Sequence, residues 1–316
     1  YQMLLNKEKN FISAVVYVYN REKDIYEFLN SLNEKLYNSF EKYEIICVND
    51  TSTDKSVEEI KRFASQIKGS VVSIVNMSFF QGMESAMYAG VDLAIGDFVY
   101  EFDEVDFSYS MELIIDVYQR SLQGYDIVSA APPRKAQKIV SKFFYRVFNK
   151  TSHTQYLLQT ESFRILSRRG INRIRSISNT IPYRKAIYAN CGLKVDTLLY
   201  ESKEPLQKNM DKNSFHKQKE TAVDAIILYT DIAYHTSIGF SMIMMLLTIL
   251  IGLYTVGVYL IGRPVAGWTT TMLFLSFAFC GLFVILTIII KYMSIILKLN
   301  FNKQKYILET IEKINN

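Results

Sequence analysis

A long stretch near the C-terminus of this 316-residue chain is almost free of charge. The chain has 36 Lys and Arg and 31 Asp and Glu residues, and of these 67 only Arg263 lies within residues 232–290. A helix needs about 20 apolar residues to cross a hydrocarbon core about 30 Å thick. Two uncharged runs, 237–261 and 265–290, reach that length on either side of a Gly-Arg-Pro break. The pattern predicts a hairpin of two transmembrane helices; buried core helices of a soluble domain are the less favoured alternative.

Basic residues flank this hairpin on both sides. They are Lys203, Lys208, Lys212, Lys217 and Lys219 before it, and Lys291, Lys298, Lys303 and Lys305 after it. Segments on the cytoplasmic side of a membrane carry an excess of Lys and Arg, so both flanks are predicted to face the cytoplasm. The chain then divides into a cytoplasmic domain at 1–230, the hairpin at 233–295 and a cytoplasmic tail at 296–316.

Composition excludes several other classes of protein. The content of 49% hydrophobic residues, with 22 Tyr and 20 Phe, is too high for a disordered chain. A net charge of +5 is too small to indicate nucleic-acid binding. The three cysteines, Cys47, Cys191 and Cys280, lie too far apart for a zinc motif or a disulfide framework.

The N-terminal part alternates strand and helix patterns. Continuous apolar and β-branched runs at 11–19, 43–48, 71–76 and 98–102 are typical of strands buried on both faces of a parallel sheet. Amphipathic helical patterns separate them, so the sequence predicts an α/β sheet with right-handed crossovers. Ligands of such sheets bind beyond the carboxyl ends of the strands. Polar residues stand at three of these ends: Asn20, Asp50 and the acidic cluster from Glu101 to Asp106.

At this point the residues resemble a known family. The segments SAVVYVYNREKDI (13–25), YEIICVNDTSTDKS (43–56), NMSFFQGMESAMYAGVDLAIGDFVYEFDEVD (76–106) and ESFRILSRR (161–169), followed by two predicted spans, are similar to the family 2 glycosyltransferases. More narrowly, they resemble the bacterial branch that transfers a sugar to polyprenyl phosphate, similar to dolichol-phosphate mannose synthase. The tail KQKYIL (303–308) is also similar to that branch. The resemblance implies an A-type glycosyltransferase domain, with a Rossmann-like mixed sheet.

The resemblance implies a binding site for a UDP- or GDP-linked sugar. The implied donor-binding residues are Tyr19, Asn20, Glu22, Asp50, Gln81, Lys208 and Ser214. Asp50 stands where the family holds the base and ribose, although an Asx turn with an N-cap needs the same residue types. The chain has Asn49 where the family usually has Asp, and Phe79-Phe80 in place of an Arg-Asn pair. A polar donor contact is therefore lost, and aromatic surface is gained.

The acidic cluster stands where the family has its Asp-x-Asp motif. Carboxylates meet a diphosphate through a hard cation with oxygen ligands, so the resemblance implies Mg²⁺ or Mn²⁺. No strict Asp-x-Asp is present. If the family motif is placed by its distance from Gly96-Asp97, its first Asp is Asp103. If it is placed by its distance from Met111-Glu112, its last Asp is Asp106. These two residues are the predicted metal ligands and catalytic residues. A solvated acidic loop is the alternative.

The acceptor side is basic. Arg134 and Lys138 begin a basic stripe on a helix predicted at about 136–150, and a second interfacial helix is predicted at about 215–232. An ordinary solvated basic face is the alternative for the first helix. The resemblance puts Arg164 beside the acceptor phosphate, together with Arg134 and Lys138, and makes Glu161 the acceptor-side carboxylate.

The expected function is inverting transfer of a sugar to polyprenyl (undecaprenyl) phosphate, for modification of cell-envelope glycans. The protein is expected to be a multi-pass protein of the bacterial inner membrane, in contact with the bilayer, with its catalytic domain in the cytoplasm. A homo-oligomer is compatible with this expectation, and nucleic acid is not an expected partner. Two alternatives stay open: a glycan or lipid-linked saccharide as acceptor, and a catalytically impaired relative that serves as a binding or assembly partner.

Overall fold

The computed structural model describes most of the N-terminal part and parts of the C-terminal region. It describes residues 7–67, 69–133, 139–151, 156–177, 183–201, 219–225, 236, 239–240, 243–244, 246–247, 250, 268–301 and 306–314. The chain forms two compact units, one from 1–225 with 303–316 and the other from 226–302. Each is described by itself.

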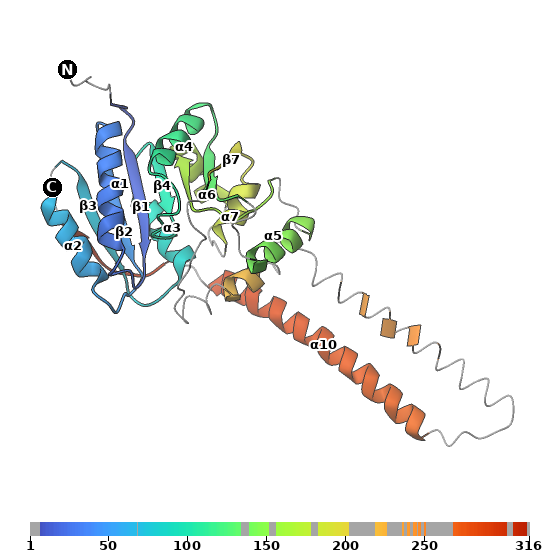
Figure 1. Ribbon diagram of the computed structural model, residues 1–316. Helices are drawn as coiled ribbons and strands as arrows, with labels where there is room; N and C mark the ends of the chain where they lie inside the picture. Colours follow the sequence, from blue (N-terminus) through green and yellow to red (C-terminus); the bar gives the residue numbers. More distant parts are fainter. Residues whose placement is uncertain are drawn as a thin grey trace, which may run out of the picture. The chain divides into compact units, whose positions relative to one another are not determined.

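The first unit is built on a mixed sheet of eight strands in the order β7-β5-β6-β4-β1-β2-β3-β8. The strands are β1 (Ile12–Val18), β2 (Tyr43–Asn49), β3 (Val71–Met77), β4 (Phe98–Phe102), β5 (Ile127–Ala131), β6 (Phe163–Ser167), β7 (Val195–Leu199) and β8 (Leu308–Lys313). Strands β1 to β4 are mutually parallel (Figure 1). Strand β6 runs antiparallel between β4 and β5. The predicted α/β fold with a mixed sheet is confirmed.

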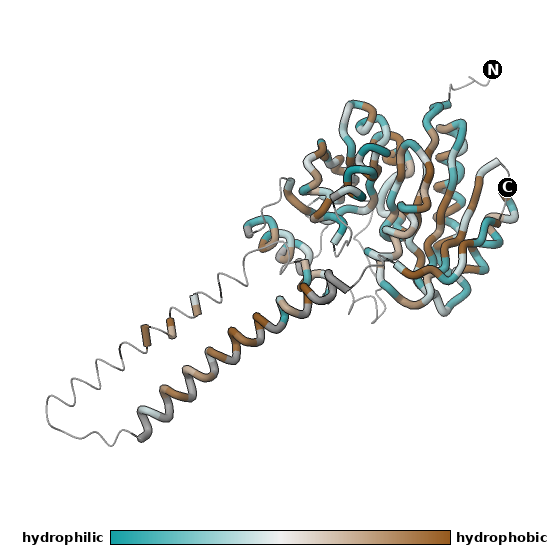
Figure 2. The backbone as a smooth tube through the Cα atoms, turned by 180° about the vertical axis from the view of Figure 1, so that it is seen from behind, coloured by the Kyte–Doolittle hydropathy of each residue, from teal (hydrophilic) through white to brown (hydrophobic). Residues whose placement is uncertain are grey.

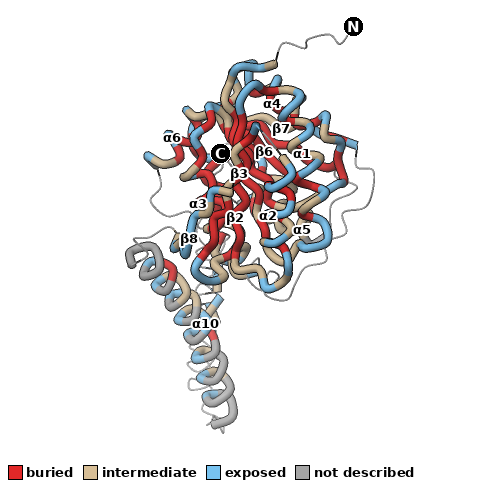
Figure 3. The backbone as a smooth tube through the Cα atoms, turned by 90° about the vertical axis from the view of Figure 1, so that its left-hand side faces the viewer, coloured by how far each residue is buried: buried red, intermediate tan, exposed pale blue. Residues whose placement is uncertain are grey.

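Helices cover the sheet and bury it. They are α1 (Ile25–Ser39), α2 (Ser56–Gln66), α3 (Met83–Leu93), α4 (Glu112–Leu122), α5 (Ile139–Thr151), α6 (Arg168–Ile177) and α7 (Arg184–Asn190). Hydrophobic segments run side by side through the domain in Figure 2, and in Figure 3 the buried residues lie at its centre, around the labels β2, β3 and β6. Every residue of β2 is buried, as expected for a strand covered on both faces.

Helix α3 lies unusually close to the sheet at Gly90. A Cβ at this position would overlap the side chain of Val15 on β1 and would lie 2.7 Å from Val48 Cγ2 on β2. Because only a residue without a side chain fits, Gly90 sets how near α3 lies to the carboxyl ends of these two strands.

The C-terminal tail contributes a strand that the sequence analysis did not anticipate. Part of the segment predicted as a tail at 296–316 forms β8, which pairs antiparallel with β3 at the edge of the sheet. Its charged and exposed side chains, including Glu309 and Lys313, suit an edge strand that must not pair with a further chain.

The second unit contains helix α10 (Trp268–Phe301), which includes most of the second predicted span. The first predicted span, 237–261, lies mostly outside the described residues. Its described positions are helical, and Phe240 and Met244 lie where a Cβ on Gly281 of α10 would stand. In the part of the chain that the structure describes, no helix has both the length and the hydropathy that a membrane crossing requires.

The structure describes most of the first predicted interfacial helix and only a part of the second. The helix expected at about 136–150 corresponds to α5. Of the helix expected at about 215–232, residues 219–225 are described and are helical.

Candidate active site

The carboxyl ends of β1, β2 and β3 bring together the predicted donor-binding residues that the structure describes, which are Tyr19, Asn20, Glu22, Asp50 and Gln81. Asp50, directly after β2, is fully buried. Its carboxylate accepts hydrogen bonds from the backbone N–H groups of Gln81 and Gly82, both at 2.8 Å, and from the Tyr17 hydroxyl at 3.0 Å. Burial first, and the nearby Asp50 carboxylate second, raise the pKa of the Tyr17 hydroxyl well above its ordinary value. Asp50 therefore fixes the loop at 78–82 that precedes α3.

Asn20 and Glu22 join the end of β1 to the loop after β2. The Asn20 side-chain oxygen accepts the backbone N–H of Thr53 at 2.8 Å, and a Glu22 carboxylate oxygen accepts that of Lys55 at 3.1 Å. Asn20 has a φ of 52°, which an Asn tolerates better than most residues. These hydrogen bonds hold the loop after β1 and the loop after β2 in a fixed position relative to each other.

Aromatic side chains lie at the same edge. The rings of Tyr19 and Phe80 have centroids 4.6 Å apart, and Phe79 is 55% exposed. The Phe79-Phe80 departure from the family pattern therefore places apolar surface beside the predicted donor residues.

The acidic cluster after β4 is paired with two buried arginines. Asp103 accepts Arg164 Nη2 at one carboxylate oxygen and Arg184 Nη2 at the other, both at 2.7 Å. Both guanidinium groups also bind Glu101, and all four side chains are buried. Burial alone would raise the pKa of the Asp103 carboxyl, but Arg164 and Arg184 hold it well below its usual range. Asp103 is therefore ionised and charge-compensated.

The ion-pair network extends to both neighbouring helices. Arg184 Nε donates to Glu84 on α3 at 2.9 Å, and Arg164 Nε donates to Glu161 at 3.0 Å. The Tyr188 hydroxyl donates to Glu101 at 2.6 Å. The network thus joins β4, β6, α3 and α7. We name it the arginine network: Glu84, Glu101, Asp103, Glu161, Arg164, Arg184 and Tyr188.

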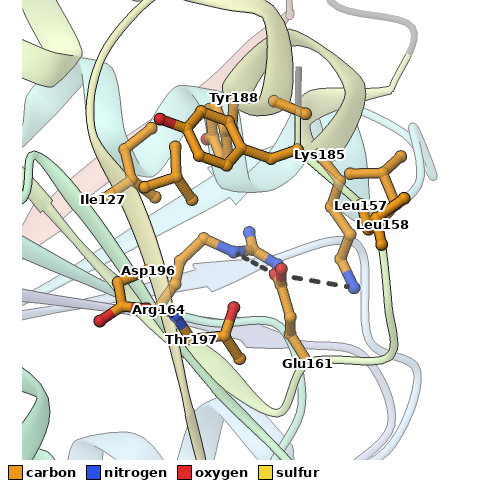
Figure 4. A pocket seen from close by; sticks show the side chains of 12 residues that line it. Ile127, Leu157, Leu158, Glu161, Arg164, Lys185, Tyr188, Asp196 and Thr197 are labelled. Carbon is orange, nitrogen blue, oxygen red and sulfur yellow. Dashed lines mark hydrogen bonds and ion pairs between the residues drawn. The ribbon is translucent and has the colours of Figure 1, made fainter. Parts of the chain in front are cut away.

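A cavity of about 200 Å³ opens beside Arg164. Glu161, Arg164 and Lys185 point toward one another across it in Figure 4, and Lys185 Nζ lies 3.9 Å from a Glu161 carboxylate oxygen. Burial alone would lower the pKa of the Lys185 ammonium, but Tyr145 and Glu161 outweigh it and raise that pKa. The apolar wall includes Ile127, Leu157, Leu158 and Val195. The cavity lining therefore includes two cations, Arg164 and Lys185, and two carboxylates, Glu161 and Asp196, beside an apolar wall.

The predicted metal ligands have other partners in this arrangement. Both Asp103 oxygens accept guanidinium N–H groups, and both Asp106 oxygens accept hydrogen bonds from Ser108, at 2.9 and 2.7 Å. Among the described residues, no three His, Cys, Asp or Glu side chains converge as a cation site would require. The acidic cluster as arranged therefore does not fit Mg²⁺ or Mn²⁺.

The sequence analysis named some of these residues and missed others. It named Asp103, Glu161 and Arg164, but it did not name Arg184, Lys185, Tyr188 or Glu84. The signal that could have found Arg184 and Lys185 is the presence of two adjacent cations at the start of α7 (Arg184–Asn190), ahead of the apolar run at 186–189. Arg134, Lys138, Lys208 and Ser214 lie outside the described residues.

Comparison with known proteins identifies the family. Residues 13–186 match the profile of the family described as "Glycosyl transferase family 2". The chain belongs to glycosyl transferase family 2. The matched range of this family 2 transferase includes all but the first residue of β1, all of β2 to β6, and every residue of the arginine network except Tyr188.

Curated relatives of this family 2 transferase include glycosyltransferases of several bacteria. An uncharacterized glycosyltransferase of Synechocystis is 29% identical over 69% of this chain and 69% of its own length. A prophage bactoprenol glucosyl transferase homolog of Escherichia coli is 29% identical over 60% of this chain and 62% of its own length.

A solved structure shares the fold of this family 2 transferase. The mannosyltransferase PcManGT of Pyrobaculum calidifontis, in complex with GDP-Man and Mn²⁺, has a TM-score of 0.51 and 14% identity. The likeness covers 70% of this chain and 63% of PcManGT. At this identity it shows the A-type glycosyltransferase fold.

Proposed function

We propose that this family 2 transferase moves a sugar from a nucleotide diphosphate sugar to polyprenyl phosphate, at the cytoplasmic face of a bacterial inner membrane. The observation that carries the proposal is the position of Arg164. Its guanidinium contacts Asp103 on the donor side, and it also lines the cavity with Glu161 and Lys185. The similarity to a bactoprenol glucosyl transferase homolog supports the same acceptor class.

In this proposal the donor and acceptor meet at the arginine network. The loops after β1, β2 and β3 hold the nucleotide, and Phe79 and Phe80 supply apolar surface for it. A phosphate monoester has its second pKa near 6 and is already largely ionised at neutral pH, so its oxygen attacks the anomeric carbon without a general base. Arg164 and Lys185 orient this phosphate, and the nucleotide diphosphate leaves from the opposite side of the sugar.

A divalent cation remains an expectation from the family pattern. Asp103 and Asp106 are its proposed ligands, but their contacts with Arg164, Arg184 and Ser108 do not fit a cation as they stand. No step of the proposed reaction is therefore assigned to a metal.

A transfer assay tests the proposal. The full chain, purified in detergent, is incubated with a panel of UDP- and GDP-linked sugars and radiolabelled undecaprenyl phosphate, with and without Mn²⁺. We expect label in a lipid-linked sugar from one donor. Transfer to saccharide acceptors alone would favour the alternative acceptor class, and failure to bind any nucleotide sugar would favour the non-catalytic alternative.

A further inference from the structure

Ile307, the residue immediately before β8, is hydrogen-bonded directly to the predicted donor loop at 78–82. The Gln81 side-chain amide donates to the Ile307 carbonyl at 2.6 Å, and the Ile307 backbone N–H donates to the Gln81 side-chain oxygen at 3.0 Å. The backbone N–H of Ser78 also donates to the Ile307 carbonyl, at 3.1 Å. The Gln81 side chain and the Ile307 backbone therefore exchange two hydrogen bonds, each donating one and accepting one.

The opposite side of the same loop is bonded to Asp50. Asp50 accepts hydrogen bonds from the backbone N–H groups of Gln81 and Gly82. Gln81 is therefore held by Asp50 through its backbone and by Ile307 through its side chain. Gly82 has a φ of 85°, a backbone conformation that disfavours residues with a side chain. The loop at 78–82 therefore takes its conformation from two partners, one of which is Ile307, immediately before the C-terminal strand.

Further contacts attach this strand to the unit. Asn76 donates to Thr310 Oγ1 at 3.0 Å, and the Tyr306 hydroxyl donates to Asp92 on α3 at 2.7 Å. Yet β8 is an edge strand whose residues are exposed or only partly buried, and Ile311 is 53% exposed. Edge segments with little buried apolar surface open locally at a lower free energy than the core. The docking of β8 is therefore open to influence by a ligand.

We propose that β8 is a component of the donor site and that Gln81 is the positioning residue that connects them. Docking of β8 orders the loop at 78–82, and a nucleoside diphosphate bound against that loop stabilises the docked strand in return. The reciprocity is required by thermodynamics, because each event changes the equilibrium of the other by the same factor. The inference rests on the proposed function, in that it takes the donor to be a nucleotide.

Hydrogen exchange of the full chain in detergent measures the linkage without catalysis. We expect saturating UDP or GDP, whichever binds, to slow exchange of the amides in 308–313 several-fold, while β5, second from the opposite edge of the sheet, serves as the reference. A direct contact between Gln81 and the nucleotide would not by itself protect β8, so this measurement separates the two roles of Gln81.

Two variants of Gln81 and a control variant of Lys61, a residue of α2 that also contacts β8, complete the test. Gln81→Ala removes both bonds to Ile307, and we expect nucleotide affinity to fall about tenfold and the protection of β8 to disappear. Gln81→Glu keeps the acceptor for the Ile307 N–H but loses the donor, so its effect should be intermediate. Lys61→Ala removes only an exposed ion pair between Lys61 and Glu312 of β8, away from the loop. An exposed pair contributes little to docking, so nucleotide affinity should fall far less than in Gln81→Ala.

The outcomes separate this inference from the proposed function. If the nucleotide binds and β8 exchange does not change, the inference is wrong while the proposed function stands. If the wild-type chain binds no nucleotide, the proposed function fails and the inference fails with it. The wild-type measurement decides the matter even where Gln81→Ala does not fold.

Discussion

Arg184 compensates three carboxylates at once, those of Glu84, Glu101 and Asp103. Removing one member of a buried ion-pair network leaves uncompensated charge and costs about 3–5 kcal/mol. We expect Arg184→Met to lower the free energy of unfolding in urea by about this amount. Glu101→Gln added to that variant removes one of the unpaired charges and should restore part of the loss. Strictly additive effects of the two changes would contradict the network.

Lys185 is the cleaner probe of the acceptor cavity, because Arg164 also compensates buried carboxylates. Its ammonium lies at 3.9 Å from Glu161, and we expect Lys185→Met to fold. A charge-assisted contact to a phosphate contributes about 1.5–3 kcal/mol, so the KM for the lipid phosphate should rise about ten- to a hundredfold, with donor affinity unchanged. Lys194→Met, an exposed cation just before β7, is the matched control. Weakened donor binding with an unchanged lipid KM would contradict this assignment.

Asp106 is the better of the two proposed metal ligands to test. Asp103→Asn would also leave Arg164 and Arg184 undercompensated and so would alter stability, whereas Asp106 bonds to nearby Ser108. We expect Asp106→Asn to abolish any stimulation of transfer by Mn²⁺ and to lower the free energy of unfolding by no more than about 1.5 kcal/mol, the contribution of one hydrogen bond to Ser108. Unaltered Mn²⁺ stimulation in Asp106→Asn would remove this residue from the proposed ligand set.

The residue types of the site were predictable, but their partners were not. Asn20, Asp50 and the cluster from Glu101 to Asp106 were predicted from polar residues that end buried strands, a pattern that depends on neighbouring sequence alone. Asp103 was selected within the cluster by the resemblance to the family. Arg164 and Arg184 reach Asp103 from strands and helices more than 60 positions away along the chain. That pairing depends on sheet order and on the position of α7, which no local pattern encodes.

Helix α3 is held against the sheet by the lack of a side chain at Gly90. Alanine there would gain about 1 kcal/mol of helix propensity, but its methyl group would overlap Val15 and crowd Val48. Overpacking costs about 1–3 kcal/mol, so Gly90→Ala should lower the free energy of unfolding despite its better propensity. Ser65→Ala on the exposed face of α2 should instead be neutral or slightly stabilising. A stabilised Gly90→Ala in urea denaturation would contradict the packing seen here.

Strands differ sharply in how well the sequence predicts them. The runs at 43–48, 71–76 and 98–102 lie within one residue of β2, β3 and β4, because buried parallel strands are continuous β-branched and aromatic runs. Strand β8 was missed, since its sequence LETIEK has the charges of an edge strand and follows a predicted membrane segment. Its pairing with β3 joins segments that lie far apart in the sequence, so no local pattern predicts it.

Two buried carboxylates make the stability of the whole domain sensitive to acid. Burial alone would raise the pKa values of Asp103 and Asp126, but Arg164 and Arg184 hold that of Asp103 low, and Arg169 with Ser167 lowers that of Asp126. A carboxyl whose pKa is depressed in the folded state stabilises it above the unfolded pKa, near 3.9, and loses that contribution as pH falls through the folded pKa.

Urea unfolding between pH 7 and pH 3 checks this expectation. The free energy of unfolding should stay level down to about pH 5 and fall increasingly below about pH 4. Asp126→Asn should be less stable at neutral pH and should show a shallower decline in acid. A domain that gains stability below pH 4 would contradict the assigned directions.

Strand β8 also limits the path of the chain between residues 226 and 302. The residues before this segment and the strand after it belong to one unit, and β8 pairs with β3 in the same sheet. A chain that enters a bilayer within this segment must therefore leave on the side where it entered, after an even number of crossings. Loss or gain of one crossing would put β8 and β3 on opposite sides of the membrane. If this segment does cross a membrane, the even number of its crossings thus follows from a hydrogen-bonded strand pair, independently of any count of flanking lysines.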